Sequence, residues 1–216
     1  MISKYFSYDE TFDSLIDPVF EEWGDRWYLK TSPNQIYTQY DNIFNNNELE
    51  NIINIGIRFG LKNASVSGNL RDISHIRRSK TSFLTPNSMT SWVYERMTAH
   101  INYLNEKYWN YDLDHIENMQ FTYYDSKENG CYTKHLDGES HNLPVKRKLS
   151  LIIQLSDPSM YEGGEILLHT SNNPIRIPKK RGLVISFPSH ILHEVTPVTS
   201  GKRYTLVSWV HGSLLR

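Results

Sequence analysis

The stretch "FPSHILHEVTPVTSGKRYTLVSWV", residues 187–210, carries most of the information about the fold. Its second half, Arg203–Val210, is rich in β-branched and aromatic residues and predicts a strand. Side chains alternate between the two faces of a strand, so one face carries Arg203, Thr205, Val207 and Trp209. Two histidines, His190 and His193, lie in the segment before this strand and directly after an apolar run. The stretch therefore predicts two strands joined by a loop that holds both imidazoles.

Further short runs of the same kind follow residue 118. They are MQFTYY (119–124), KLSLIIQL (148–155), GEILLHT (164–170) and GLVISF (182–187). No helical stretch of ten or more residues separates them, so the crossovers of a parallel sheet are not expected. The pattern predicts an antiparallel sandwich or jelly roll.

Two amphipathic helices are predicted before these runs. Asn45 with Glu48 three residues later is typical of a capping box, and Gly60 marks the end of the first helix. Its apolar face consists of Leu49, Ile52, Ile53 and Ile57. The second helix is expected over 88–108, with an apolar face of Val93, Met97, Ile101, Leu104 and Tyr108. Since no linker or repeat divides the 216 residues, we expect a single domain over 1–216. In it, a helix-rich part at 1–117 would pack on a β core at 118–216, which makes the fold class α+β.

Charge and cysteine content exclude several classes of function. The chain has 23 Lys plus Arg against 24 Asp plus Glu, so no global field favours nucleic acid or an anionic membrane as a partner. Cys131 is the single cysteine, which excludes a multi-thiolate metal site and fits a reducing compartment. We find no signal peptide and no run of about 18 apolar residues. A cytoplasmic protein is therefore expected.

The triplet His135-Leu136-Asp137 has the spacing of a metal-binding pair. With 9 histidines and 11 aspartates in 216 residues, chance predicts about half an occurrence of such a triplet, so a solvated turn is the competing interpretation. His190 or His193 could supply a third ligand from the end of the apolar run. Two imidazoles and one carboxylate form the facial triad of non-haem Fe(II) oxygenases, although a hydrolytic zinc site uses similar ligands.

Strand alternation places Tyr124, Gln154 and Arg203 on the more polar faces of their strands. If these faces line the interior of a barrel, the three side chains converge there. A buried arginine requires an anion, and its planar fork suits a carboxylate. An internal salt bridge would satisfy it, and so would the carboxylate of a metal-chelating 2-oxo acid.

The order Tyr124, His135-x-Asp137, Gly163-Gly164-Glu165 and the block 187–209 resembles the Fe(II)- and 2-oxoglutarate-dependent dioxygenases. Within them it is most similar to the prolyl 4-hydroxylase-like branch that includes PKHD-type hydroxylases. The likeness covers roughly residues 120–210. It implies a double-stranded β-helix, the jelly-roll fold that is also called cupin-like, with the N-terminal helices as support.

The resemblance also implies roles for individual residues. The iron ligands would be His135, Asp137 and His193, of which the last is preferred to His190 because it lies ten residues before Arg203. The 2-oxoglutarate-binding residues would be Arg203, Tyr124 and Gln154. Gln154 stands where some members of the family have a tyrosine, which leaves its contact in question. Residues near the substrate or behind the site would be Tyr132, Trp209 and His190, and for Tyr132, Gln154 and Trp209 a packing role is equally compatible.

By this resemblance, the chain is expected to hydroxylate a prolyl residue in a peptide or protein, using Fe(II), dioxygen and 2-oxoglutarate and releasing succinate and CO2. Ascorbate is an expected reductant. The alternatives are hydroxylation of a free amino acid or another small molecule, and a noncatalytic jelly-roll binding module.

Arg77, Arg78 and Lys80 form a small basic cluster outside the main motifs. We interpret it as a solvated loop, with contact to an acidic substrate or nucleic acid as the alternative.

Overall fold

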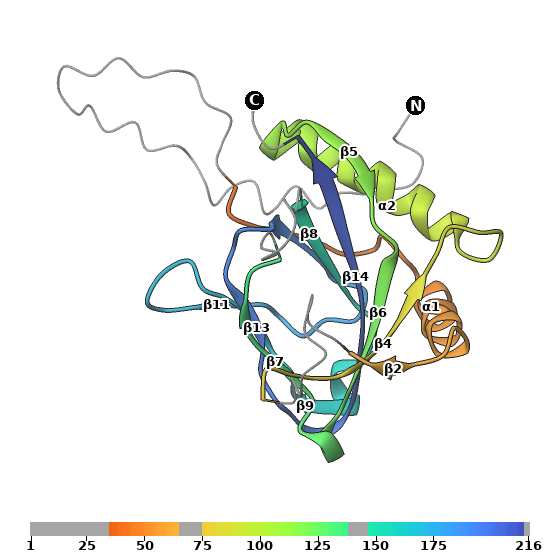
Figure 1. Ribbon diagram of the computed structural model, residues 1–216, viewed down its shortest axis with the longest axis vertical. Coiled ribbons are helices and arrows are strands. Elements are labelled where there is room, and N and C mark those ends of the chain that lie inside the picture. The colour runs from red at the N-terminus through yellow and green to blue at the C-terminus, as the bar shows by residue number, and fades with distance from the viewer. Residues whose placement is uncertain (1–34, 65–74, 138–146, 214–216) are drawn as a thin grey trace.

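The computed structural model describes residues 35–64, 75–137 and 147–213 (Figure 1). In these residues two antiparallel sheets face each other. The larger sheet has the order β1 (Thr38–Tyr40), β12 (Val184–Pro188), β8 (Arg147–Gln154), β14 (Val198–Gly212), β6 (Met119–Asp125), β4 (Lys80–Leu84) and β2 (Lys62–Asn63), and β5 (Leu113–Ile116) and β9 (Tyr161–Gly163) also pair with β14. The smaller sheet has the order β11 (Ile175–Arg176), β10 (Ile166–Leu168), β13 (His193–Val195), β7 (Cys131–His135) and β3 (Arg77–Arg78). This is a double-stranded β-helix, which confirms the predicted fold class.

Two helices, α1 (Asn46–Arg58) and α2 (Ser91–Leu104), cover the large sheet on the side away from β7 and β13 (Figure 1). One apolar core joins them to that sheet. It contains Leu49 and Ile52 of α1, Met97 of α2, and Phe121 and Leu151 of the sheet. The helices therefore support the outer face and leave the space between the sheets to other side chains.

The capping box of α1 is confirmed. The Asn45 side chain accepts a hydrogen bond from Glu48 N at 3.0 Å, and the Glu48 carboxylate accepts one from Asn45 N at 2.8 Å. The prediction that Ile57 lies on the buried face is wrong, since Ile57 is 46% exposed. Gly56 lies there instead, so close to the sheet that a Cβ would come within 2.3 Å of the Phe121 ring. The buried face of the helix therefore continues from Ile52 and Ile53 to Gly56, and Ile57 lies outside it.

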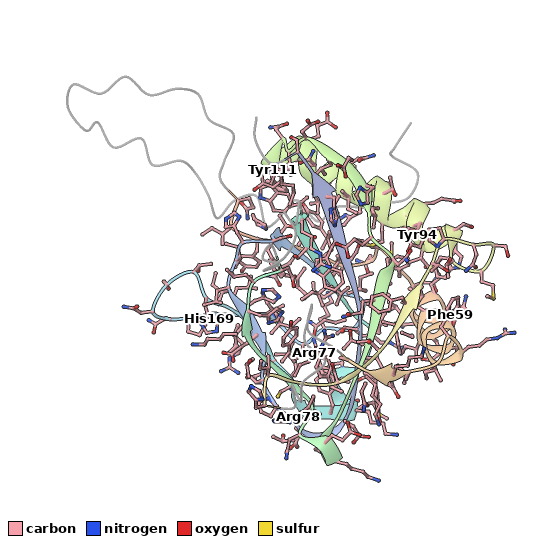
Figure 2. All side chains as sticks on the ribbon, in the orientation of Figure 1. Phe59, Arg77, Arg78, Tyr94, Tyr111 and His169 are labelled. Atoms are coloured by element: carbon pink, nitrogen blue, oxygen red, sulfur yellow. The ribbon has the colours of Figure 1, made fainter. Side chains whose placement is uncertain are left out.

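The second predicted helix is shorter than expected. α2 ends at Leu104, and a single π-helical turn continues to Trp109. The wider turn leaves Tyr108 partly buried, with its hydroxyl 2.9 Å from that of Tyr40. Tyr94 of α2 (Figure 2) donates its hydroxyl proton to Leu84 O at 2.5 Å and accepts from Met119 N at 3.1 Å. One phenol thus ties the helix to β4 and β6.

The strands predicted after residue 118 are present as β6, β8, β10, β12 and β14. Four short strands, β7, β9, β11 and β13, were not predicted, and the part before residue 118 also supplies β1 to β5 to the two sheets. The N-terminal part is therefore less purely helical than expected. Within the described ranges, no helix is long and apolar enough to cross a membrane.

His100 is a fully buried histidine of α2, and its ring packs edge-on against Tyr40. Burial lowers the pKa of His100 to about 3. The unfolded chain binds the proton below about pH 6.5, so stability is lost as the pH falls from 6.5 toward 3. Between pH 7 and pH 5 we expect the wild type to lose about 2 kcal/mol more free energy of unfolding than His100→Gln.

Urea denaturation at the two pH values measures this difference. His75→Gln, at an exposed position, is the control and should keep the wild-type pH dependence. Equal losses in the wild type and His100→Gln would show that this histidine does not destabilise the folded protein in acid.

Candidate metal and co-substrate site

The inner face of the large sheet carries the polar residues that alternation predicted. Arg203 of β14 lies opposite Tyr124 of β6, and Thr205, two residues further on the same face, lies opposite Gln154 of β8. Antiparallel neighbours at the same register point to the same side of a sheet. The three predicted residues therefore share one face, and all three are buried.

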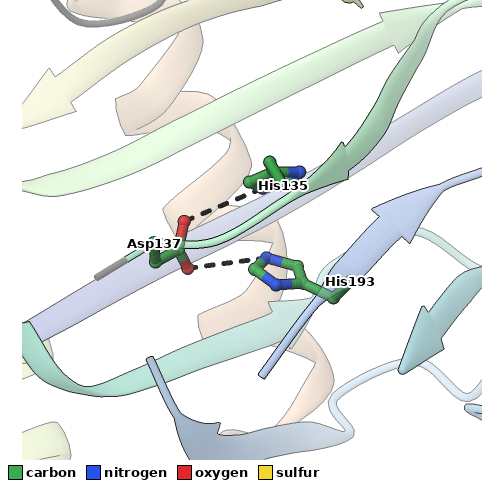
Figure 3. Close-up of side chains that lie close together, drawn as sticks. All are labelled: His135, Asp137 and His193. Atoms are coloured by element: carbon green, nitrogen blue, oxygen red, sulfur yellow. Dashed lines mark ion pairs between the residues drawn. The ribbon is translucent and has the colours of Figure 1, made fainter. Parts of the chain in front are cut away.

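His135, Asp137 and His193 come together on the opposing sheet (Figure 3). His135 ends β7 and His193 begins β13, and these two residues are paired across the strands. His135 Nε2 lies 3.7 Å from Asp137 Oδ1, and His193 Nε2 lies 3.5 Å from Asp137 Oδ2. One candidate ligand atom from each residue lies within 4.8 Å of the others, a separation that fits a common metal ion.

Backbone carbonyl groups orient both imidazoles. His135 Nδ1 lies 2.7 Å from Thr133 O, and His193 Nδ1 lies 2.9 Å from Ile191 O. A proton on Nδ1 satisfies each carbonyl and leaves Nε2 as the free lone pair, the arrangement common for metal-binding histidines. Burial, and then His193, lower the pKa of His135 to about 4, so its ring is neutral at pH 7. A neutral ring is the form that binds a metal.

Hydrogen bonds hold the Asp137 carboxylate in place. Ser150 donates to Asp137 Oδ2 at 2.8 Å and lies 2.9 Å from the Ser189 hydroxyl. Burial acts to raise the pKa of Asp137, but His193, His135, Trp209 and Ser150 outweigh it and keep the pKa below its ordinary value. The group is therefore an anion in a buried position, ready to bind a cation.

Arg203 is 1% exposed, and its Nε, Nη1 and Nη2 make no hydrogen bond within the described ranges. Its guanidinium lies 5.4 Å from the centre of the Tyr124 ring. Gly164 makes room for the stem, since a Cβ there would come within 2.8 Å of Arg203 Cδ. No described residue forms a salt bridge with it, and a buried guanidinium without compensation is costly. The site fits an anionic ligand that supplies the missing partner.

The other predicted site residues have varied surroundings. Gln154 donates its amide proton to Pro178 O at 2.6 Å, so its contact with a co-substrate stays a prediction. Tyr132 stacks on the His135 ring at 3.5 Å between centres. Trp209 is buried, and its indole nitrogen has no partner within hydrogen-bonding geometry among the described residues. The indole N–H nevertheless helps to lower the pKa of Asp137. His190 is exposed, in the turn between β12 and β13.

Two supporting contacts were not predicted. Ser150 lies on the inner face of β8 opposite Trp209, and the alternation of residues 148–154 already contained that signal. Arg147 forms a two-pronged ion pair with Glu117, and its guanidinium lies 4.0 Å from the centre of the Trp209 ring. Nothing local in the sequence relates residues 117, 147 and 209, because only the pairing of β5, β8 and β14 brings them together.

The donor set suits Fe(II) or Zn(II), and the triad alone does not distinguish them. The unpartnered Arg203 adds a buried cation beside the triad, and this cation calls for an anionic ligand as well as the metal. Two antiparallel sheets that enclose two histidines, a carboxylate and this arginine define a class: the double-stranded β-helix proteins with a facial triad.

Comparison with known proteins points to one family within this class. Residues 119–211 match the family described as the 2OG-Fe(II) oxygenase superfamily. A PKHD-type hydroxylase of Prochlorococcus marinus is 38% identical over 85 residues, which cover 39% of this chain and 38% of that protein. Another, of Hyphomonas neptunium, is 33% identical over 92 residues and 41% of each chain. The chain thus matches about two fifths of the length of these relatives.

Solved structures resemble a larger share of the fold. A prolyl hydroxylase of Trichoplax adhaerens, in complex with a hypoxia inducible factor peptide fragment, has a TM-score of 0.69 at 17% identity and covers 82% of this chain and 84% of its own. A prolyl-4-hydroxylase of Pseudomonas putida has a TM-score of 0.68 at 16% identity, and the match covers 82% of this chain and 93% of that protein. At such identities the likeness shows the shared fold.

Proposed function

We propose that the chain is an Fe(II)- and 2-oxoglutarate-dependent dioxygenase that hydroxylates a prolyl residue in a peptide. The observation that carries the proposal is the combination of the triad with Arg203, a fully buried guanidinium without a partner in the described residues, inside one β-helix. A noncatalytic binding module would have no use for both features, and each is costly to bury.

In this proposal His135, Asp137 and His193 hold the metal from one side, so that the opposite positions stay open for ligands. Arg203 binds the distal carboxylate of 2-oxoglutarate with its planar fork, and Tyr124 beside it offers a hydroxyl proton. With iron and 2-oxoglutarate bound, the site would supply the oxidising chemistry that inserts one oxygen atom of O2 into a C–H bond and releases succinate and CO2. Ser150 keeps the Asp137 carboxylate oriented, and the sheets exclude bulk water.

A prolyl substrate is supported by the names of the relatives. The matched PKHD-type proteins are called hydroxylases, and the solved structures of similar fold are prolyl hydroxylases, one of them in complex with a peptide. The second candidate is hydroxylation of a free amino acid, whose carboxylate would pair with the buried Arg77.

The decisive experiment is an assay of the purified chain with Fe(II), ascorbate, 2-oxoglutarate and a panel of proline-containing peptides and free amino acids. We expect succinate to form, and one panel member to gain the mass of one oxygen atom in mass spectrometry. Succinate without a prolyl product would leave the oxygenase in place and remove the prolyl substrate. No succinate under any condition would contradict the whole proposal.

A further inference from the structure

The buried charges of the protein are few and lie together. Among the described residues, the aspartate, glutamate, lysine and arginine side chains that are buried are Arg77, Asp137 and Arg203. All three influence the pKa of the Tyr124 hydroxyl. Burial is the main cause that raises this pKa, Asp137 also raises it, and the two arginines lower it. Two cations and one anion thus share a single buried region.

Arg77 does not belong to a solvated loop, so the interpretation from the sequence is wrong for this residue. It is 8% exposed and lies on β3, where pairing with β7 places it opposite Tyr132 (Figure 2). Its Nε donates to the Ser79 hydroxyl at 2.9 Å, and its guanidinium lies 4.6 Å from the centre of the Tyr132 ring. Arg78, the next residue, turns the other way and donates to Asn129 O at 3.0 Å.

The terminal nitrogens of Arg77 are not committed to the protein. Within residues 35–64, 75–137 and 147–213, Arg77 forms no ion pair, and its recorded hydrogen bond uses Nε alone. The fork of Nη1 and Nη2 is the part of a guanidinium that binds a carboxylate in two-pronged fashion. Its neighbour Tyr132 stacks on His135, so this fork lies one aromatic ring away from a candidate metal ligand.

The charges of the loaded site leave one cation without a counterpart. Fe(II) would add two positive charges to Arg77 and Arg203, against one negative charge on Asp137 and two on 2-oxoglutarate. A buried charge that stays uncompensated is unfavourable by several kcal/mol. Arg203 comes from the large sheet and Arg77 from the small one, so a single 2-oxoglutarate anchored at Arg203 leaves Arg77 to another ligand.

We propose that Arg77 binds a carboxylate of the substrate, which makes the substrate an amino acid or a peptide with an acidic group next to the hydroxylated residue. This inference rests on the proposed function and specifies its substrate class. A peptide with only neutral groups around its proline would leave the guanidinium unpaired.

The test compares acids with their amides. The probes are L-proline with L-prolinamide, and the blocked peptides acetyl-Ala-Pro-Asp-Ala-amide and acetyl-Ala-Pro-Asn-Ala-amide. Binding to the Zn(II)-loaded protein with 2-oxoglutarate is measured by calorimetry, and succinate formation by the Fe(II)-loaded protein is measured in parallel. We expect an acid to bind about 10- to 100-fold more tightly than its amide, as a charge-assisted pair provides. The pair that responds identifies the source of the carboxylate.

Arg77→Gln should remove the preference for the acid and leave the affinity for 2-oxoglutarate within about twofold, while Arg77→Lys should restore part of it. The matched control is Arg78→Gln, which should keep the full preference. If Arg77 has a purely structural role, Arg77→Gln should weaken the binding of the acid and of the amide equally, and this result would overturn the proposal. Weaker binding of 2-oxoglutarate to Arg77→Gln would assign this residue to the co-substrate and overturn the proposal. The proposal would also be overturned if the wild type bound neither L-proline nor the aspartate-containing peptide.

Binding to the Zn(II) form needs no turnover, so the result is independent of the proposed activity. Acid binding without succinate formation would contradict the dioxygenase and keep the carboxylate site. Succinate formation without a preference for the acid would support the dioxygenase and contradict the carboxylate site at Arg77.

Discussion

Arg203→Met is expected to abolish the response to 2-oxoglutarate and at the same time to stabilise the ligand-free protein. The guanidinium of Arg203 is buried without a partner in the described part of the chain, so the free protein bears the cost of desolvating it. An apolar side chain of similar length removes that cost, and we expect the free energy of unfolding to rise by about 1–3 kcal/mol. Loss of the anchor should weaken 2-oxoglutarate binding by at least about thirtyfold, because truncating one partner of a buried charge pair costs 2 kcal/mol or more.

Thermal unfolding with and without 2-oxoglutarate, in the presence of Mn(II), measures both effects in one experiment. A ligand that binds only the folded state raises the melting temperature, and this rise should be present in the wild type and absent in Arg203→Met. Lys202→Met, at the exposed neighbouring position of β14, is the matched control. An unchanged ligand response in Arg203→Met would reassign the anchor, and a large loss of stability would show that a partner already satisfies the guanidinium.

Asp137→Ala removes the anionic member of the triad and is expected to lower succinate formation by more than a hundredfold. Changes to groups that only orient a metal ligand already cost about 10- to 100-fold in affinity or activity, so loss of a direct ligand should cost more. The two imidazoles that remain would bind the metal without charge compensation. Metal content after dialysis against Fe(II) or Co(II), together with turnover, measures the effect.

His115→Ala serves as the control for Asp137→Ala. His115 is an exposed histidine of β5 next to Asp114, so it resembles a metal-binding pair in composition but lies on the surface. We expect full metal content and turnover in this variant, and an intact melting transition in both. Turnover of Asp137→Ala at the wild-type level would remove Asp137 from the triad.

Several features were predictable because they depend on neighbours in the chain. The capping box of Asn45 and Glu48 and the alternation of β6, β8 and β14 follow from local geometry. Alternation also predicted that Tyr124, Gln154 and Arg203 lie on the more polar faces of their strands. The pairing register of these strands brings those faces to the same side of the sheet. The short strands β7 and β13 were missed because five and three residues with mixed polarity carry no periodic signal.

The sequence by itself therefore determined the antiparallel β core, the candidate ligands and the polar face of the large sheet. Each of these follows from the spacing of residues along the chain or from the resemblance to a family. Only the tertiary structure decided which side chains are buried away from water. It placed Gly56 against the sheet and left Ile57 exposed, and it joined Ser150 to Asp137 and Arg147 to Trp209. It also separated Arg77 from Arg78, two adjacent arginines with opposite surroundings, because pairing of β3 with β7 directs alternate side chains to opposite faces.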